Sequence, residues 1–167
     1  LDRVILPLET PAETLDALRR AGHALILEIP RALWGVEAPV RARMEALRRE
    51  GFTHFWCGNL GAAALCRELE VSAHGGFSLN IFNTQSLRFF ESLGLCDAEV
   101  SMELTGGELA ALGGTLPRGT LVYGRQPLML TRNCPLANSK KGCLHCKRPL
   151  SIRDRSPHST TCAAPWS

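Results

Sequence analysis

The sequence predicts an α/β fold: part of a TIM-like (β/α)8 barrel, followed by a cysteine-rich tail that a metal organises. Three observations predict this fold. Six strand-like apolar runs alternate with helix-like segments over residues 1–130, which is the pattern of a parallel sheet. The repeat of roughly 23 residues fits a barrel of this kind. Residues 131–167 carry four cysteines and too few apolar residues for a large core. We therefore divide the chain into a barrel portion, 1–130, and a metal-binding tail, 131–167.

In the first three strand–helix units, capping residues mark where helices begin and glycines mark where they end. Thr10 and Glu13 form a capping box with Pro11 at the first helical position, and Gly22 ends that helix. An apolar stripe at helical spacing marks the second helix, which stops at Gly51. These signals place strands at 3–8, 23–30 and 52–57, and helices at 10–22, 36–51 and 60–69.

The remaining units follow the same alternation. Asn83 or Thr84 caps a helix that ends before Gly94. Thr105 and Glu108 form a second capping box, which opens a further helix. Strands are expected at 70–74, 98–103 and 120–130.

Six strands do not close a barrel of this type. Eight strand–helix units need about 200 residues or more, so we expect an incomplete barrel, or one that is completed by strands upstream in a longer chain. The chain begins at Leu1 rather than at a methionine, which fits a missing N-terminal part of the same protein. No G-x-G-x-x-G motif follows the first strand and no P-loop occurs, so nucleotide-binding Rossmann folds lose their usual support.

The tail cysteines have the spacing C-x8-C-x2-C-x15-C, at Cys134, Cys143, Cys146 and Cys162. Four thiolates that converge on one point are the ligands of a [4Fe-4S] cluster or of a structural zinc ion. The spacing alone does not choose between iron and zinc. Disulfides and unligated thiols are the alternatives, and the odd total of seven cysteines weighs against disulfides.

The other three cysteines, Cys57, Cys66 and Cys96, lie in apolar segments typical of reduced, buried thiols. No signal peptide is recognisable. No apolar run approaches the ~18–20 residues that span a bilayer, so we expect no membrane partner. Reduced thiols predict a cytoplasmic location.

Charge is distributed unevenly along the chain. The net charge is +3, but the tail holds seven basic residues against the single acidic residue Asp154, which leaves the barrel portion slightly acidic. A basic segment around a metal site suits an anionic partner such as RNA. The alternative is that these side chains solubilise the tail or balance the charge of a thiolate-ligated cluster.

Two titratable residues are candidates for catalysis. His74 precedes Gly75 and Gly76 at the end of a strand, where barrel enzymes carry their active sites. Glu103 ends another expected strand and is a candidate base or substrate ligand. The alternatives are a structural loop histidine and a carboxylate at a helix entry.

Amide and guanidinium groups supply candidates for substrate binding. Asn80 and Asn83 flank an apolar pair in a βα loop, where they suit a carboxylate or a base edge, although Asn83 also suits a helix cap. Arg125 and Arg132 bracket the last expected strand and suit bidentate recognition of a carboxylate or phosphate. Surface or pairing roles are the alternative for both arginines.

Several blocks, taken in order, carry a family resemblance: VSAHGGFSLNIFN at 71–83, SMEL at 101–104, VYGRQPLMLTRNCP at 122–135, GCLHCK at 142–147 and DR at 154–155. Together they cover nearly the whole chain and resemble the peptidase U32 family, in particular the C-terminal barrel portion of its long members. The resemblance implies a TIM-barrel-like fold. It adds Tyr123, within the third block, to the candidate substrate-binding residues.

The family was first described as peptidases or collagenases. Its better understood members are similar to iron–sulfur proteins that hydroxylate RNA bases or a quinone precursor, and the RNA-acting members take the hydroxyl group from prephenate. The resemblance therefore implies tRNA or rRNA and a small-molecule hydroxyl donor as partners. Cys134, Cys143 and Cys146 match the family's cluster ligands. After Arg155 the family continues with glycine and Phe-Pro-Val, whereas this chain reads Ser-Pro-His, which leaves Cys162 as fourth ligand open.

Three hypotheses follow. The first is an iron–sulfur-dependent RNA hydroxylase, the second a peptidase, and the third a zinc-organised binding module without catalysis. The sequence contains no H-E-x-x-H or G-x-S-x-G motif and no evident Cys–His pair. The four tail cysteines favour the first and third hypotheses over the second.

Overall fold

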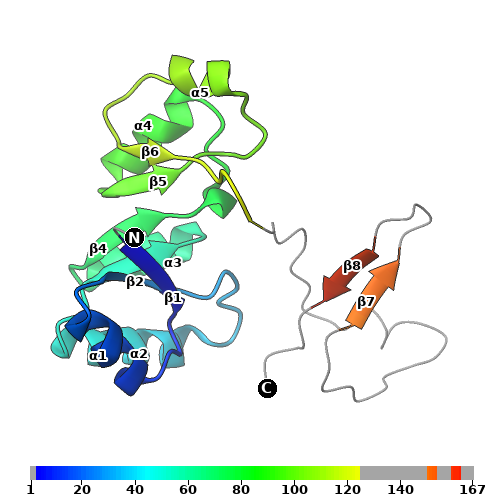
Figure 1. Ribbon diagram of the computed structural model, residues 1–167. Coiled ribbons are helices and arrows are strands. Elements are labelled where there is room, and N and C mark those ends of the chain that lie inside the picture. Colours follow the sequence, from blue (N-terminus) through cyan, green and yellow to red (C-terminus); the bar gives the residue numbers. More distant parts are fainter. Residues whose placement is uncertain (1–2, 125–149, 154–158, 163–167) are drawn as a thin grey trace. The chain divides into compact units, whose positions relative to one another are not determined.

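The computed structural model describes residues 3–124 and the backbone of residues 150–153 and 159–162. The chain divides into two units, 1–124 and 125–167 (Figure 1), and each is described by itself.

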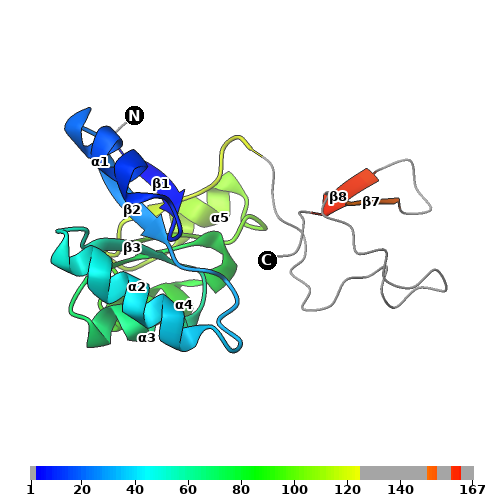
Figure 2. The same ribbon diagram turned by 90° about the horizontal axis from the view of Figure 1, so that it is seen from below.

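The first unit is built on a sheet of six strands, all parallel, whose order in space equals their order in the chain. The strands are β1 (Arg3–Pro7), β2 (Ala24–Glu28), β3 (His54–Cys57), β4 (Ser72–Gly75), β5 (Asp97–Glu99) and β6 (Arg118–Gly119). The sheet is curled into half of a barrel (Figure 2), which is compatible with part of a TIM-like barrel. The predicted parallel α/β architecture is thereby confirmed for this unit.

A helix follows each of the first five strands and returns the chain to the start of the next one. These helices are α1 (Ala12–Arg20), α2 (Glu37–Arg49), α3 (Leu60–Glu68), α4 (Thr84–Ser92) and α5 (Gly106–Ala111), and a 3-10 turn, η1 (Phe77–Leu79), precedes α4. Their apolar faces pack against one side of the sheet, and the fully buried side chains of this core include Leu15, Leu27, Met44, Leu47, Phe55 and Leu87.

The register of the strands assigns side chains to the two faces of the sheet. Phe55 pairs with Ala73, and both belong to the core beneath the helices. Successive side chains of a strand point to opposite faces, so His54 and Trp56 project from the other, concave face. His74 pairs with Trp56 and therefore lies on that face as well. The concave face thus receives the two histidines together with Trp56.

Most predicted elements are confirmed, with shorter strands. The capping box at Thr10 is wrong: the Thr10 hydroxyl donates to the Pro7 carbonyl oxygen at 2.7 Å, and Pro11 is the N-cap without a side-chain hydrogen bond. The capping box of Thr105 and Glu108 is confirmed. So is the cap by Asn83, whose side chain accepts from the Ser86 N–H.

Two predicted strands differ from the structure. The strand expected at 98–103 ends at Glu99, where β5 stops. The strand expected at 120–130 is replaced by β6 at 118–119, and residues 120–124 do not pair with the sheet. Val122 and Tyr123 are 93% and 97% exposed, so this apolar run finds no core to bury it. Residues 125–130 lie outside the described part of the chain.

The second unit contains an antiparallel pair, β7 (Leu150–Arg153) and β8 (Ser159–Cys162). In its register Leu150 lies opposite Cys162. Across the described ranges, no helix has the length and apolar character needed to cross a membrane.

Candidate functional site

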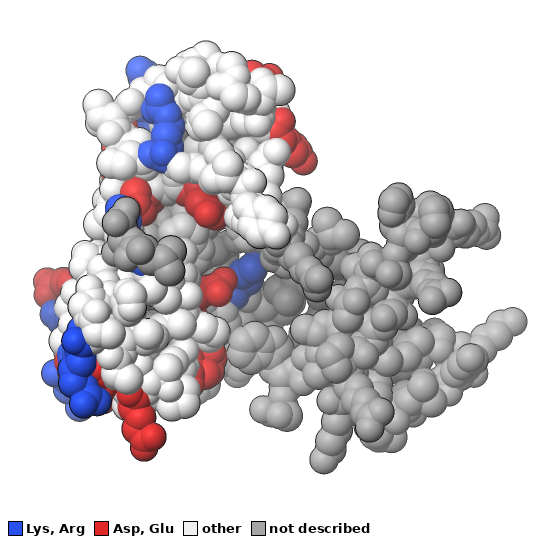
Figure 3. Space-filling view, in the orientation of Figure 1, with Lys and Arg blue, Asp and Glu red and all other residues white. Residues whose placement is uncertain are grey.

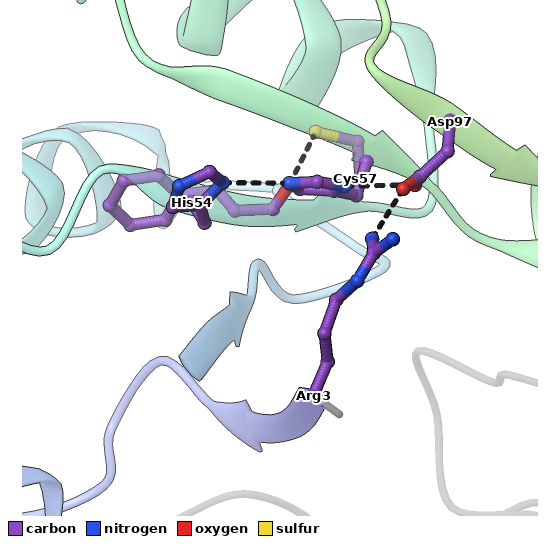
Figure 4. A network of polar contacts seen from close by, with 6 residues as sticks. Arg3, His54, Cys57 and Asp97 are labelled. Carbon is purple, nitrogen blue, oxygen red and sulfur yellow. Dashed lines mark hydrogen bonds and ion pairs between the residues drawn. The ribbon is translucent and has the colours of Figure 1, made fainter. Parts of the chain in front are cut away.

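A chain of polar contacts crosses the concave face of the sheet and joins side chains from four strands (Figure 4). Nδ1 of His54, on β3, lies 3.0 Å from Nε2 of His74, on β4. Nδ1 of His74 lies 2.8 Å from Oδ1 of Asp97, on β5. The other carboxylate oxygen of Asp97 accepts from the Arg3 guanidinium on β1. These four residues form the concave-face network.

Position along the strands explains why these residues meet. Arg3, His54 and Asp97 are each the first residue of their strand, so they lie near one end of the sheet. His74 pairs with Asp97 in the sheet register, which places the two side chains on the same face. His74 is 4% exposed, Asp97 is half-buried and His54 is exposed. The network therefore extends from the buried imidazole of His74 to the solvent-exposed imidazole of His54.

The charged and polar groups of the network shift the pKa values of Asp97 and His54. Burial works against the charge of Asp97, but hydrogen bonds from Arg3 and His74 outweigh it and hold the pKa of this carboxyl below its usual range. Partial burial, followed by the neighbouring His74 and Arg3, lowers the pKa of His54, while Asp97 opposes that shift. At neutral pH the network therefore contains an ionised aspartate and a neutral His54.

A second group of polar residues lies where the strands end. Glu28 is the last residue of β2 and Glu99 the last residue of β5, both on the concave face by their register. Oε2 of Glu99 accepts from the Phe77 N–H at 3.2 Å. The Arg31 guanidinium lies over the Phe77 ring, 5.1 Å from its centroid. Figure 3 shows acidic side chains, with a basic one beside them, along the middle of this unit.

Burial raises the pKa of both glutamates. Arg31 lowers the pKa of Glu28 and Glu9 raises it, although burial has the larger effect. For Glu99 the Phe77 N–H lowers the pKa, and the charge of Glu28 raises it. Two carboxylates with raised pKa values at the carboxyl ends of parallel strands are suited to holding or exchanging protons.

The two candidate catalytic residues from the sequence, His74 and Glu103, lie in different environments in the structure. His74 lies within β4 and belongs to the network. Glu103 lies in an exposed turn beyond the end of β5, and its N–H donates to the Ser101 hydroxyl at 3.4 Å. The structure therefore does not bring these two candidate catalytic residues together in one group of contacts.

The candidate binding residues are also separate. Asn80 is exposed and adopts the left-handed conformation, φ 49°, at the end of η1. Asn83 caps α4, and Tyr123 is almost fully exposed. Outside the described residues lie Arg125, Arg132, Cys134, Cys143 and Cys146, and of Cys162 the structure gives the backbone in β8.

Sequence reasoning missed Arg3, His54 and Asp97, together with the glutamate pair. The signal that marks them is the alternation within short strands. His54 and Trp56 alternate with the buried Phe55 and Cys57, and Asp97 and Glu99 flank the buried Ala98. A polar residue at every second position of a strand in a parallel sheet indicates a face that the helices do not cover.

The cysteines of the first unit are thiols. Cys57 and Cys66 are fully buried with their sulfur atoms 3.5 Å apart, as expected for reduced core residues. Their mutual hydrogen bond, and then burial, raise the pKa of the Cys57 thiol, which stays protonated. The expectation that Cys96 is buried is wrong, because this residue is exposed.

Among the described residues, no group of three or more His, Cys, Asp or Glu side chains is arranged to hold a metal ion. The network and the glutamate pair themselves offer proton transfer and hydrogen bonding. Comparisons with protein-family models, curated proteins and solved structures give no match for this chain.

Proposed function

We propose that this chain is the cluster-binding portion of an iron–sulfur protein, similar in kind to the U32 family, that hydroxylates RNA bases. The observation that carries the proposal is the order of parts in the chain. A half-barrel of parallel strands with a polar concave face is followed by a basic segment with four cysteines. In such folds the half-barrel supplies a substrate site and the thiolates supply a cluster site.

The donor set fits the cluster. Four cysteine thiolates are the ligands of a [4Fe-4S] centre, and Cys134, Cys143, Cys146 and Cys162 provide them. The hairpin register supports Cys162 as the fourth ligand. Cys162 lies opposite Leu150, which follows Cys146 by four positions in the chain, so pairing brings Cys162 within about 20 Å of Cys146 at most. Fifteen intervening residues would otherwise allow a far larger separation.

The residues of this chain have separable roles in the proposed reaction. The bound cluster would supply electron transfer or activation of an oxygen donor such as prephenate. The basic side chains of the tail hold RNA phosphates. The concave-face network and the pair of Glu28 and Glu99 supply groups that bind and exchange protons. We assign this chemistry to the cytoplasm, where thiolate ligands stay reduced.

Peptidase activity has less support from the described residues. Both ring nitrogens of His74 are taken up by His54 and Asp97. Within residues 3–124, no serine, threonine or cysteine side chain is hydrogen-bonded to a histidine ring, which is the pairing that an activated nucleophile needs. A structural zinc ion on the same four thiolates remains the alternative that the donor set allows.

Metal analysis of the anaerobically purified full chain tests the proposal. We expect a brown protein with about four irons and matching sulfide, as in cysteine-ligated clusters. Cys143→Ser and Cys162→Ser should lose most of the iron. Cys96→Ser, which removes an exposed cysteine outside the tail, is the matched control and should keep it. One zinc ion per chain and no visible absorption would overturn the proposal.

RNA as the substrate class needs a separate test. The iron-loaded protein, a reductant and prephenate are incubated with total tRNA and rRNA, and nucleosides are analysed by mass spectrometry for the gain of one oxygen atom. The double variant Lys140→Gln/Lys141→Gln should bind RNA more weakly and with a shallower salt dependence. Arg19→Gln/Arg20→Gln, on α1, is the control for charge alone. Unchanged nucleosides together with cleavage of a peptide library would favour the peptidase.

A further inference from the structure

We propose that Asp97, His74 and His54 form a proton relay across three neighbouring strands, which ends at Nε2 of His54 and accepts the proton of a hydroxyl group or water molecule on the concave face (Figure 4). The relay uses residues of the first unit alone. The proposed relay therefore does not depend on whether the tail binds a cluster.

The hydrogen bonds fix the tautomers of both histidines. An ionised carboxylate is only an acceptor, so Nδ1 of His74, 2.8 Å from Asp97, carries a proton. In the state in which both rings are neutral, Nε2 of His74 is an acceptor, because a neutral imidazole has one donor and one acceptor nitrogen. His54 Nδ1, 3.0 Å away, must then be the donor to it. This leaves the lone pair of His54 at Nε2, which points away from the network.

Packing holds the relay in this arrangement. The His74 side chain is 5% exposed and both of its nitrogens are used, so rotation of the ring would leave buried polar groups without partners. Asp97 is held from its other side by Arg3. His54, in contrast, is exposed. A small protic ligand can therefore reach the exposed His54 side chain while the rest of the relay stays fixed.

The transfer balances without an oxidant or a reductant. The ligand's O–H proton moves to Nε2 of His54, and the electron pair of that bond stays on the oxygen. The Nδ1 proton of His54 moves along its hydrogen bond to Nε2 of His74. His74 then carries a proton on each nitrogen and one positive charge, next to the Asp97 carboxylate, while His54 is neutral again. The carboxylate keeps its charge, as the orienting aspartate of a catalytic triad does.

A purely structural tie between strands is the competing role, and the charges around His54 distinguish the two. His54 faces Arg3 from β1, His74 from β4 and Asp97 from β5. Arg3 lowers the pKa of His54, whereas Asp97 raises it. Removing either partner breaks the same ion pair, so a purely structural tie predicts a similar loss of stability for both variants. Coupling of His54 to the charges of the network predicts, in addition, opposite shifts of its pKa in the two variants.

Nitrogen-15 NMR of the histidine rings in the full chain reads both the tautomers and their pH dependence. In the wild type we expect His54 and His74 as Nδ1–H tautomers above neutral pH. Asp97→Asn should move the protonation of His54 to lower pH, and Arg3→Gln should move it to higher pH. His23→Gln assigns the signal of a histidine outside the network. A proton on Nε2 of His54, or shifts of equal sign in the two variants, would overturn the relay.

A chemical readout keeps the proposal falsifiable if a variant does not fold. Diethyl pyrocarbonate acylates imidazole nitrogens that carry a lone pair. In the folded wild type we expect modification at Nε2 of His54 and none at His74 until the protein is unfolded. Mass spectrometry of the digested chain locates the label. Modification of His74 in the folded protein, or lack of reaction at His54, would contradict the assignment. Because neither readout requires iron, failure of the relay is distinguishable from failure of the proposed hydroxylase.

Discussion

Arg3 and Asp97 form an ion pair across the concave face of the sheet, although their strands, β1 and β5, are not neighbours. Four strand spacings of ~4.8 Å would separate these strands by about 19 Å in a flat sheet. An arginine and an aspartate side chain do not span that distance together. The contact therefore exists because the sheet curls, and it ties the first strand to the fifth.

This ion pair makes the stability of the first unit sensitive to acid. The pKa of Asp97 is lowered in the folded protein, so its contribution to stability is present above the unfolded value, near pH 4, and is lost as the pH falls through the folded value. Asp97→Asn should destabilise the fold at pH 7 by about 1–3 kcal/mol and flatten the decline in acid. Urea unfolding at several pH values measures both effects.

Asp16→Asn is the matched control for that prediction. Asp16 pairs with Arg19 on the same exposed helix face, where an ion pair contributes about 0–1 kcal/mol. If Asp97→Asn weakens the fold no more than Asp16→Asn does, the tie between β1 and β5 has no energetic importance.

The glutamates at the strand ends should have the opposite pH dependence. The pKa of Glu99 is raised by burial, so folding favours its protonated form. The corresponding stability is present below the unfolded pKa and is lost as the pH rises through the folded pKa. Glu99→Gln should therefore stabilise the fold at pH 7 by a few tenths of a kcal/mol and give no gain at pH 4. Thermal unfolding at the two pH values decides this, and a larger gain in acid would contradict it.

The close approach of Gly76 to Trp56 should make this position intolerant of a side chain. A Cβ at Gly76 would lie 2.5 Å from Nε1 of Trp56, although the backbone, with φ −86°, suits any residue. Gly76→Ala should therefore cost about 1–3 kcal/mol through overpacking and shift the tryptophan emission. Gly106→Ala, in open space at the start of α5, should be neutral or stabilise by up to about 1 kcal/mol. Equal stability of the two variants would show that Trp56 moves aside freely.

The core beneath the helices should account for most of the stability of the first unit. Leu87 in α4 is fully buried, whereas Leu60 in α3 is 53% exposed. Leu87→Ala should cost about 2–5 kcal/mol, and Leu60→Ala should stay within about 0.5 kcal/mol. Both lie in helices, so the difference between the two free energies of unfolding isolates burial from helix propensity. Similar losses would mean that α4 does not pack as described.

The sequence by itself determined the order and type of the elements in the first unit. The glycine stop at Gly51 and the caps at Asn83 and Thr105 act within a few residues, so local chemistry reveals them. The prediction from the sequence failed at Thr10, because the Thr10 hydroxyl donates to the Pro7 carbonyl oxygen instead of capping the helix. It also failed at residues 120–124, where the apolar side chains are not buried in a core.

Only the tertiary structure decided which polar residues meet. His74 was recognisable as a candidate, but its two partners, His54 and Asp97, come from two other strands. Arg3, which holds Asp97, is 94 residues away from it in the chain. Strand register and the curl of the sheet bring them together. Alternation within one strand indicates a polar face, whereas the distance between side chains of different strands depends on how the whole sheet bends.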